Sequence, residues 1–142
     1  MKMDMNGNRT RQRRHGFTLL EIIIVIIIIS ILASLAMPRY SKTVEYARGL
    51  EALIQIGTIR QSLNRYYLPK QTYVGATLNN LDVENPMTDI MAHFTYTIFI
   101  SSPVAFTVVA TRNTFDGGDN SSMMTIDQDG IKSGTGIYSG VR

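Results

Sequence analysis

Residues 17–37 read FTLLEIIIVIIIISILASLAM, an apolar run of 21 residues that decides how the rest of the chain can fold. The polar side chains within this run are Thr18, Glu21, Ser30 and Ser34. As a helix the run is about 31 Å long, which matches a hydrocarbon core about 30 Å thick. A carboxylate at that depth costs roughly 2.5–3.5 kcal/mol, so it is a candidate functional group by default. The sequence therefore predicts a membrane-length helix in which Glu21 has a specific role.

The positive charge of the chain is concentrated in front of this run. The whole sequence has a formal net charge of +3, but residues 1–16 alone hold five basic residues and one acidic residue, a net charge of +4. The remaining residues have a net charge of −1. A basic segment before an apolar helix is typical of a cytoplasmic flank. We therefore expect no nucleic-acid binding on the basis of charge.

Two general interpretations of the N-terminus leave Glu21 unexplained. One is a signal-anchor helix over Phe17–Met37. The other is a cleaved secretory signal peptide, with Ser34-Leu35-Ala36 as a small-x-small cleavage site. The apolar run is longer than the usual signal-peptide core of roughly 7–15 residues, and neither interpretation gives a reason for a carboxylate.

A third interpretation starts from the stretch RRHGFTLLE at residues 13–21 and the proline Pro38 behind the apolar run. This arrangement resembles the processing site of type IV pilins and type II secretion pseudopilins, the class III signal peptide. The resemblance implies that a prepilin peptidase removes the leader 1–16 by cutting after Gly16. It also implies that the new N-terminal residue Phe17 is N-methylated and that Glu21 is the fifth residue of the mature chain.

The same resemblance implies how the subunit assembles. The Phe17 amine of one subunit would pair with Glu21 of a neighbour, and breaking one half of a buried ion pair costs roughly 3–5 kcal/mol. The spacing of four residues also allows a pair within one subunit. The implied partners are copies of the chain or related pilins, the prepilin peptidase, an inner-membrane assembly platform and the inner membrane. The protein is expected as a single-pass inner-membrane protein with a periplasmic or extracellular C-terminal domain, and in a pilus or pseudopilus after assembly.

Helical patterning continues behind the membrane-length run, in residues 38–68. One apolar face is predicted from residues spaced three and four apart, namely Tyr46, Leu50, Leu53, Ile56, Ile59, Leu63 and Tyr66. We expect one helix from about Phe17 to about Leu68, kinked at Pro38 because a proline removes a backbone hydrogen bond. Pro69 is the expected end of the helix.

The rest of the chain predicts a loop over residues 69–93 and an antiparallel sheet over residues 94–142. Apolar and polar residues alternate through Phe94–Ile100, and a second strand ends near Arg112. Further strands are expected around Met124–Ile126 and from Ile131. The apolar face of the helix is the natural cover for this sheet. The expected fold class is α+β, a pilin-like long N-terminal helix packed on a three- to four-stranded antiparallel sheet.

Few residues indicate catalytic or metal chemistry. The sequence has no cysteine, which excludes disulfides, thiolate metal sites and a catalytic cysteine. His93 stands alone, and we find no Ser/His/Asp arrangement, paired catalytic carboxylates or phosphate loop, so we expect no enzyme. We expect no cofactor, with one low-ranking calcium hypothesis based on four C-terminal carboxylates, Asp116, Asp119, Asp127 and Asp129. The alternative is that these are ordinary turn residues.

The sequence thus predicts a structural subunit of a type IV pilus-like filament, polymerised through its N-terminal helix. Whether it is a pilin or a secretion pseudopilin stays open. The alternative function is a single-span membrane-anchored periplasmic binding domain that does not polymerise.

Overall fold

The computed structural model describes residues 16–141, and the chain divides into two compact units between Tyr40 and Ser41. Helix α1, Leu19–Lys70, contributes residues to both units. The predicted leader, residues 1–16, lies outside the described residues except for Gly16.

The first unit holds the apolar part of α1. The exposed fractions of its large apolar side chains lie between 42% for Ile23 and 81% for Leu19. This is the one helix in the described chain that is long and apolar enough to cross a membrane. Its two serines are satisfied within the helix, since Ser30 Oγ donates to the Ile26 carbonyl at 2.7 Å and Ser34 Oγ to the Ile31 carbonyl at 2.8 Å. No serine hydroxyl of this run therefore needs a partner from outside.

Both ends of α1 lie two residues later than the predicted Phe17 and Leu68. At the C-terminal end, Pro69 lies inside the last turn and does not end the helix. The helix ends because Gln71 adopts a left-handed backbone conformation, with φ of 54°, and its N–H donates to the Tyr67 carbonyl at 2.7 Å. Helix α1 also continues through Pro38. The kink at Pro38 stays a prediction.

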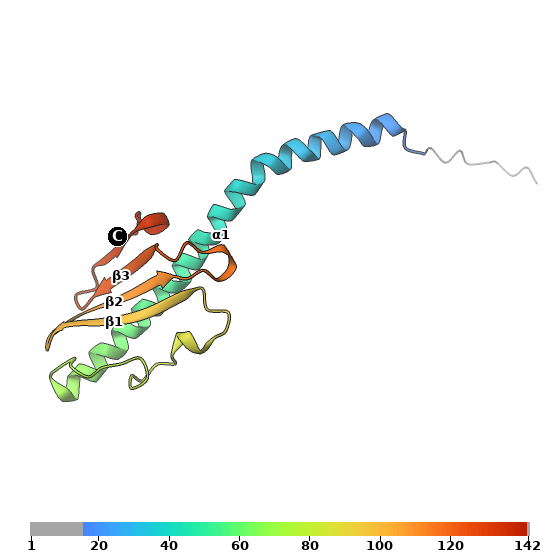
Figure 1. Cartoon of the computed structure of the whole chain (residues 1–142). Coiled ribbons are helices and arrows are strands. Elements are labelled where there is room, and N and C mark those ends of the chain that lie inside the picture. Colours follow the sequence, from blue (N-terminus) through green and yellow to red (C-terminus); the bar gives the residue numbers. More distant parts are fainter. Residues whose placement is uncertain (1–15, 142) are drawn as a thin grey trace, which may run out of the picture. The chain divides into compact units, whose positions relative to one another are not determined.

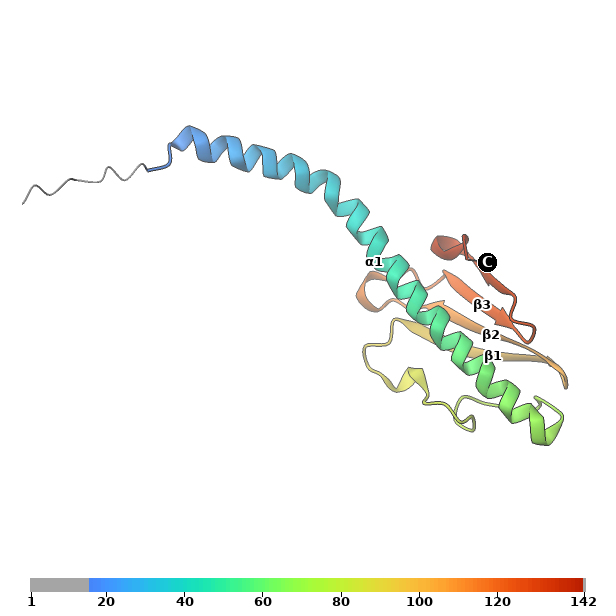
Figure 2. The ribbon, with the colours of Figure 1, turned by 180° about the vertical axis from the view of Figure 1, so that it is seen from behind.

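The second unit pairs the later part of α1 with a four-stranded antiparallel sheet. The strands are β1 (Phe94–Ser102), β2 (Ala105–Arg112), β3 (Met123–Asp127) and β4 (Lys132–Gly134), hydrogen-bonded in that order. Two short 3₁₀ helices lie in the connections, η1 (Pro86–Thr88) before β1 and η2 (Phe115–Gly117) between β2 and β3, and a third, η3 (Gly136–Tyr138), follows β4. Figures 1 and 2 show the strands side by side with α1 across one face. The α+β fold class is confirmed.

The core lies between α1 and the inward face of the sheet. Ile56, Ile59 and Leu63 of α1 are fully buried against inward residues of the strands such as Phe106 and Met124. Alternate residues of β1 are buried or half-buried, as the sequence pattern predicts.

The predicted apolar face of α1 is wrong at its N-terminal end. Tyr46 and Leu50 are 65% and 46% exposed, and the buried positions there are Gly49 and Ala52. The reason is the ring of Tyr138, which occupies the space beside Gly49: a Cβ built at Gly49 would lie 2.6 Å from Tyr138 Cε1. Small residues thus face the core at this end, and the large apolar ones face outward.

Candidate processing and assembly site

The N-terminus of α1 is closed by a reciprocal pair of hydrogen bonds between Thr18 and Glu21. The Glu21 backbone N–H donates to Thr18 Oγ1 at 3.2 Å, and the Thr18 backbone N–H donates to Glu21 Oε2 at 3.4 Å. This is a capping box, in which the N-cap hydroxyl and the carboxylate three residues later satisfy backbone donors that the helix leaves free. An N-cap of this kind is worth about 0.5–2 kcal/mol.

The capping box determines where the Glu21 carboxylate points. It turns back toward the start of its own helix, where the partial positive charge of the helix dipole also favours an anion. The carboxylate accepts a hydrogen bond from the backbone N–H of Thr18, the residue directly after Phe17. Cleavage between Gly16 and Phe17 would therefore create a cation one residue from the group that Glu21 already contacts. The T-x-x-E spacing of residues 18–21 is the sequence signal for this capping box.

The predicted cleavage position, between Gly16 and Phe17, is exposed to solvent in the described chain. Gly16 is exposed, no heavy atom lies within 4 Å of a Cβ built on it, and Phe17 is 80% exposed. The predicted processing residues Gly16 and Phe17 thus lie just before α1, and the predicted assembly residue Glu21 lies in its first turn.

A second polar cluster, which the sequence did not reveal, lies in the other unit around the fully buried Arg112. Its Nε and Nη2 atoms donate to the two carboxylate oxygens of Glu45, at 3.0 and 3.1 Å. Its Nη1 atom donates to the backbone carbonyls of His93, Asn113 and Phe115, at 2.9–3.0 Å. Arg48 joins the cluster through ion pairs with Glu45 and Asp116.

This cluster fixes the protonation states of its members. Hydrogen bonding to Arg112 holds the pKa of Glu45 below its ordinary value, although burial acts against that shift. Burial raises the pKa of Tyr138, whose hydroxyl donates to Glu45 at 3.4 Å, to about 12, and the charge of Glu45 adds to that shift. The cluster joins α1 to the end of β2 and to η2, with every described buried polar side-chain atom satisfied. It has the character of a structural joint, because its ionic groups are already paired with one another.

The four calcium candidates do not form one cluster, and each is engaged in a local structure. Asp116 pairs with Arg48, and Asp119 accepts from the backbone N–H groups of Ser121 and Ser122 at 3.1 and 3.0 Å. Asp127 accepts from the N–H groups of Asp129 and Ile131, at 3.0 and 2.8 Å, in the β3–β4 turn. Within residues 16–141, no three His, Cys, Asp or Glu side chains are close enough together to hold a metal ion. This donor set does not fit calcium as arranged, and calcium binding itself stays an untested prediction.

Comparison with known proteins connects the N-terminal site to a described motif. A family model for the prokaryotic N-terminal methylation motif matches residues 11–37, a range that includes the Gly16–Phe17 bond, Glu21 and the apolar run. The recognition made from the sequence is confirmed: the N-terminal part of this chain carries that motif.

Curated relatives include both pilins and secretion proteins. The chain is 34% identical over 71 residues to a "probable minor fimbrial protein" of Dichelobacter nodosus, covering 50% of this chain and 45% of the relative. It is 38% identical over 63 residues to type II secretion system core protein G of Aeromonas hydrophila, covering 44% of each. It is 30% identical over 89 residues to the type IV major pilin protein PilE1 of Neisseria gonorrhoeae, covering 63% of this chain and 41% of the relative. The chain spans less than half the length of these relatives.

A solved structure supports the fold independently. The non-core minor pilin PilV of Neisseria meningitidis superimposes with a TM-score of 0.52 at 23% sequence identity, over 63% of this chain and 85% of that one. At this identity the likeness concerns the fold, a long N-terminal helix packed on an antiparallel sheet.

Proposed function

We propose that this chain is a structural subunit of a type IV pilus-like filament, either a pilin or a type II secretion pseudopilin. It is made as a prepilin, cleaved after Gly16, N-methylated at Phe17 and polymerised through α1 with copies of itself or related pilins. A prepilin peptidase and an inner-membrane assembly platform are the machinery that this route requires. Before assembly the chain is a single-pass membrane protein, and afterwards it is part of the filament.

The observation that carries this proposal is the arrangement at the start of α1. An exposed Gly16–Phe17 bond is followed by a carboxylate at Glu21, and then by an apolar helix of membrane length with none of its candidate span buried. A plain anchor explains the apolar surface but not the glycine, the phenylalanine and the glutamate together. The methylation-motif match over residues 11–37 and the relatives of both filament types support the same proposal.

The capping box supports a specific assembly step. In the isolated subunit Glu21 satisfies the Thr18 N–H of its own helix, so the carboxylate is not left without a partner in an apolar environment. On docking, the methylated Phe17 amine of a neighbour offers a full positive charge. A charge pair in a dry environment is stronger than a hydrogen bond to a neutral amide. Glu21 therefore exchanges a local partner for one in the neighbouring subunit.

Intact-mass and N-terminal analysis of the membrane-extracted protein tests this proposal. The expected result is a chain that starts at Phe17 and carries one methyl group. A chain starting at Met37 would indicate a secreted domain, and an uncut chain starting at Met1 would indicate a permanent anchor. Either of those results would overturn the proposal.

A further inference from the structure

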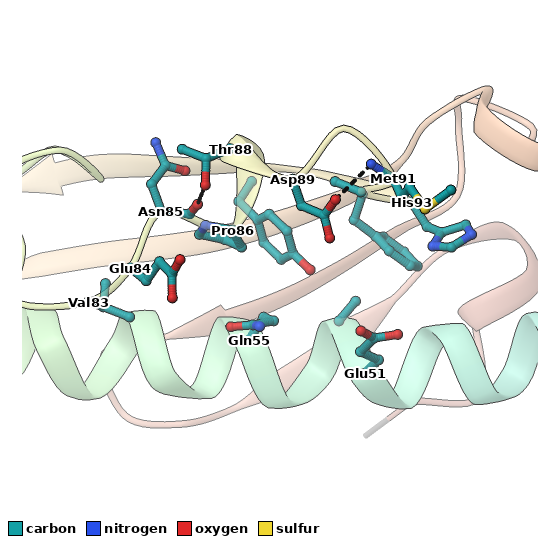
Figure 3. A pocket seen from close by; sticks show the side chains of 14 residues that line it. Glu51, Gln55, Val83, Glu84, Asn85, Pro86, Thr88, Asp89, Met91 and His93 are labelled. Atoms are coloured by element: carbon teal, nitrogen blue, oxygen red, sulfur yellow. Dashed lines mark hydrogen bonds between the residues drawn. The ribbon is translucent and has the colours of Figure 1, made fainter.

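A polar groove lies between α1 and the loop that precedes β1, on the opposite side of the second unit from the C-terminal η3. It has a volume of about 390 Å³. Glu51 and Gln55 of α1 form one wall, and Glu84 and Asp89 of the loop face them from the other (Figure 3). Three carboxylates therefore line this groove, without lying close enough together to hold a metal ion among the described residues.

Within the described residues, none of these three carboxylates has an ion pair. Glu51 and Glu84 have no hydrogen bond either, and Asp89 accepts one from the Met91 backbone N–H at 2.9 Å. Three arginines of this unit are paired with other carboxylates: Arg65 with Asp82, and Arg48 and Arg112 with Glu45. The groove thus has a negative charge that the described part of the chain does not balance.

Tyr96 gives a second, independent indication of a ligand. Its side chain lines the groove, and the residue is only 6% exposed. Its hydroxyl has no hydrogen-bond partner among the described residues. Every fully buried polar side-chain atom of those residues does have a partner. The Tyr96 hydroxyl is therefore not fully buried, and it opens onto the groove that the side chain lines. Burial, reinforced by the charge of Glu51, raises the pKa of Tyr96 to about 12, so the phenol stays neutral and can accept a hydrogen bond from a cation.

The chain itself carries a cation that matches. Lys42 is exposed on α1, nine residues before Glu51, and has no carboxylate partner in the described structure. Nine residues make two and a half helical turns, so the two side chains project from opposite sides of α1, about 13.5 Å apart along its axis. The exposed apolar residues Tyr46, Leu50 and Ile54, spaced four apart, form a row along α1 that starts between Lys42 and Glu51 and ends three residues beyond Glu51; they are 65%, 46% and 70% exposed.

From this arrangement we infer that the groove beside Glu51 receives Lys42 of a second copy of the chain. The contact is heterologous: each copy offers a groove on one side of α1 and a lysine on the other. A heterologous contact that does not close on itself generates an open filament. Neighbouring copies would be staggered along α1 by about 13.5 Å, the axial distance between the two residues. The apolar row along α1 is partly covered by the neighbouring helix. This inference rests on the proposed filament function, and adds to it the surface that sets subunit register.

Cysteine crosslinking in filaments tests the contact directly, because the chain has no native cysteine. The full-length chain with both Lys42→Cys and Glu51→Cys, assembled in cells and treated with a short bis-maleimide, should give a ladder of dimers, trimers and longer species. Each single variant should stay monomeric. Dimers from a single variant would indicate a two-fold contact, and a product with a different protein would indicate another occupant of the groove. Either result overturns the inference.

Charge reversal gives a second test without crosslinking. Lys42→Glu and Glu51→Lys should each lower the amount of sheared filament about tenfold or more, since like charges facing each other are strongly unfavourable, and the double reversal should restore most of it. Lys132→Glu on β4 is the control, with the same change in charge outside the contact. Both reversed side chains are exposed, so the unfolding midpoint should not move. Failure of the double variant to recover overturns the pairing.

The experiments distinguish a failure of the proposed function from a failure of the Lys42–groove contact. If the unmodified chain forms no filament, the proposed function is wrong and this inference falls with it. If it forms normal filaments but the double-cysteine chain gives no ladder, the inference alone is wrong.

Discussion

Glu21 has one interaction in the structure and a second one in the proposed filament. In the isolated subunit it is the acidic member of a capping box with Thr18. In the proposed filament it is the partner of a neighbour's Phe17 amine. The two roles differ in what they need from the side chain. The capping box needs only a hydrogen-bond acceptor, which Gln also supplies, whereas the intersubunit pair needs a charge.

A pair of variants separates these roles. Glu21→Gln keeps the acceptor and loses the charge, so we expect normal cleavage after Gly16 but a large loss of sheared filament. Thr18→Val removes the N-cap hydroxyl and keeps the charge, so we expect cleavage and filament yield close to those of the unmodified chain. Filament yield and N-terminal mass are measured on the same cultures. Normal filament yield from Glu21→Gln would refute the charge-pairing role.

Arg112 is the central residue of the polar cluster in the second unit. It is fully buried, and its guanidinium holds Glu45 together with three backbone carbonyls. Removing one partner of a buried pair leaves the other uncompensated.

We therefore expect Arg112→Ala to lower the free energy of unfolding by about 3–5 kcal/mol. Arg65→Ala is the matched control, because its pair with Asp82 is exposed and exposed pairs contribute little. Denaturant unfolding of the full chain in detergent, followed by tyrosine fluorescence, measures both. Equal losses from the two variants would show that the Arg112 cluster is not a joint between α1 and the sheet.

At the scale of the element, α1 has two glycines with opposite surroundings. The site for a Cβ at Gly49 is occupied by the Tyr138 ring, whereas nothing lies within 4 Å of the corresponding site at Gly57. Gly49 is needed for close approach, but Gly57 only costs the helix conformational entropy.

The same substitution should therefore act in opposite directions. Gly49→Ala is expected to destabilise the chain by about 1–3 kcal/mol, because the buried Tyr138 ring must shift. Gly57→Ala is expected to stabilise it by about 0.5–1 kcal/mol. Denaturant unfolding midpoints of the two variants, compared with that of the unmodified chain, measure both changes. A stabilising Gly49→Ala would contradict the close packing of Tyr138 on Gly49.

The elements also show what the sequence could and could not predict. Alternation in Phe94–Ile100 and the helical spacing of Ile56, Ile59 and Leu63 are local signals, and the structure confirms both. Arg112 is the last inward-facing residue of β2. From the sequence, an arginine at this position indicates only the end of the strand, and its burial is not predicted. The exposure of Tyr46 follows from Tyr138, 92 residues further along, and no local pattern contains that contact.

At the scale of the whole molecule, three carboxylates make stability depend on pH. Hydrogen bonds from Arg65, and then Ser62, lower the pKa of Asp82 to about 2, although solvent screening of this exposed pair keeps its share of the stability small. Arg112 lowers the pKa of Glu45, and the Ser122 hydroxyl and N–H lower that of Asp119. Because each folded pKa lies below its unfolded value, the unfolded chain binds more protons in acid. The stability from these groups is complete at neutral pH and is lost as the pH falls.

We expect the free energy of unfolding to be level from pH 7 to about 5 and to decrease down to about pH 2. Asp119→Asn keeps an oxygen acceptor for the Ser121 and Ser122 N–H groups and removes the titration, so its decrease should be shallower. Denaturant titrations at a series of pH values measure both curves. A stability that rises on acidification would contradict the assigned directions.

In the proposed filament, cleavage after Gly16 and assembly are chemically linked. The most direct measurement is the intact mass of the chain recovered from sheared, purified filaments. We expect a subunit that begins at Phe17 and carries one added methyl group, with no uncut chain in the filament. Filaments built from chains that keep residues 1–16 would contradict it, because the Phe17 amine that pairs with Glu21 would then not exist.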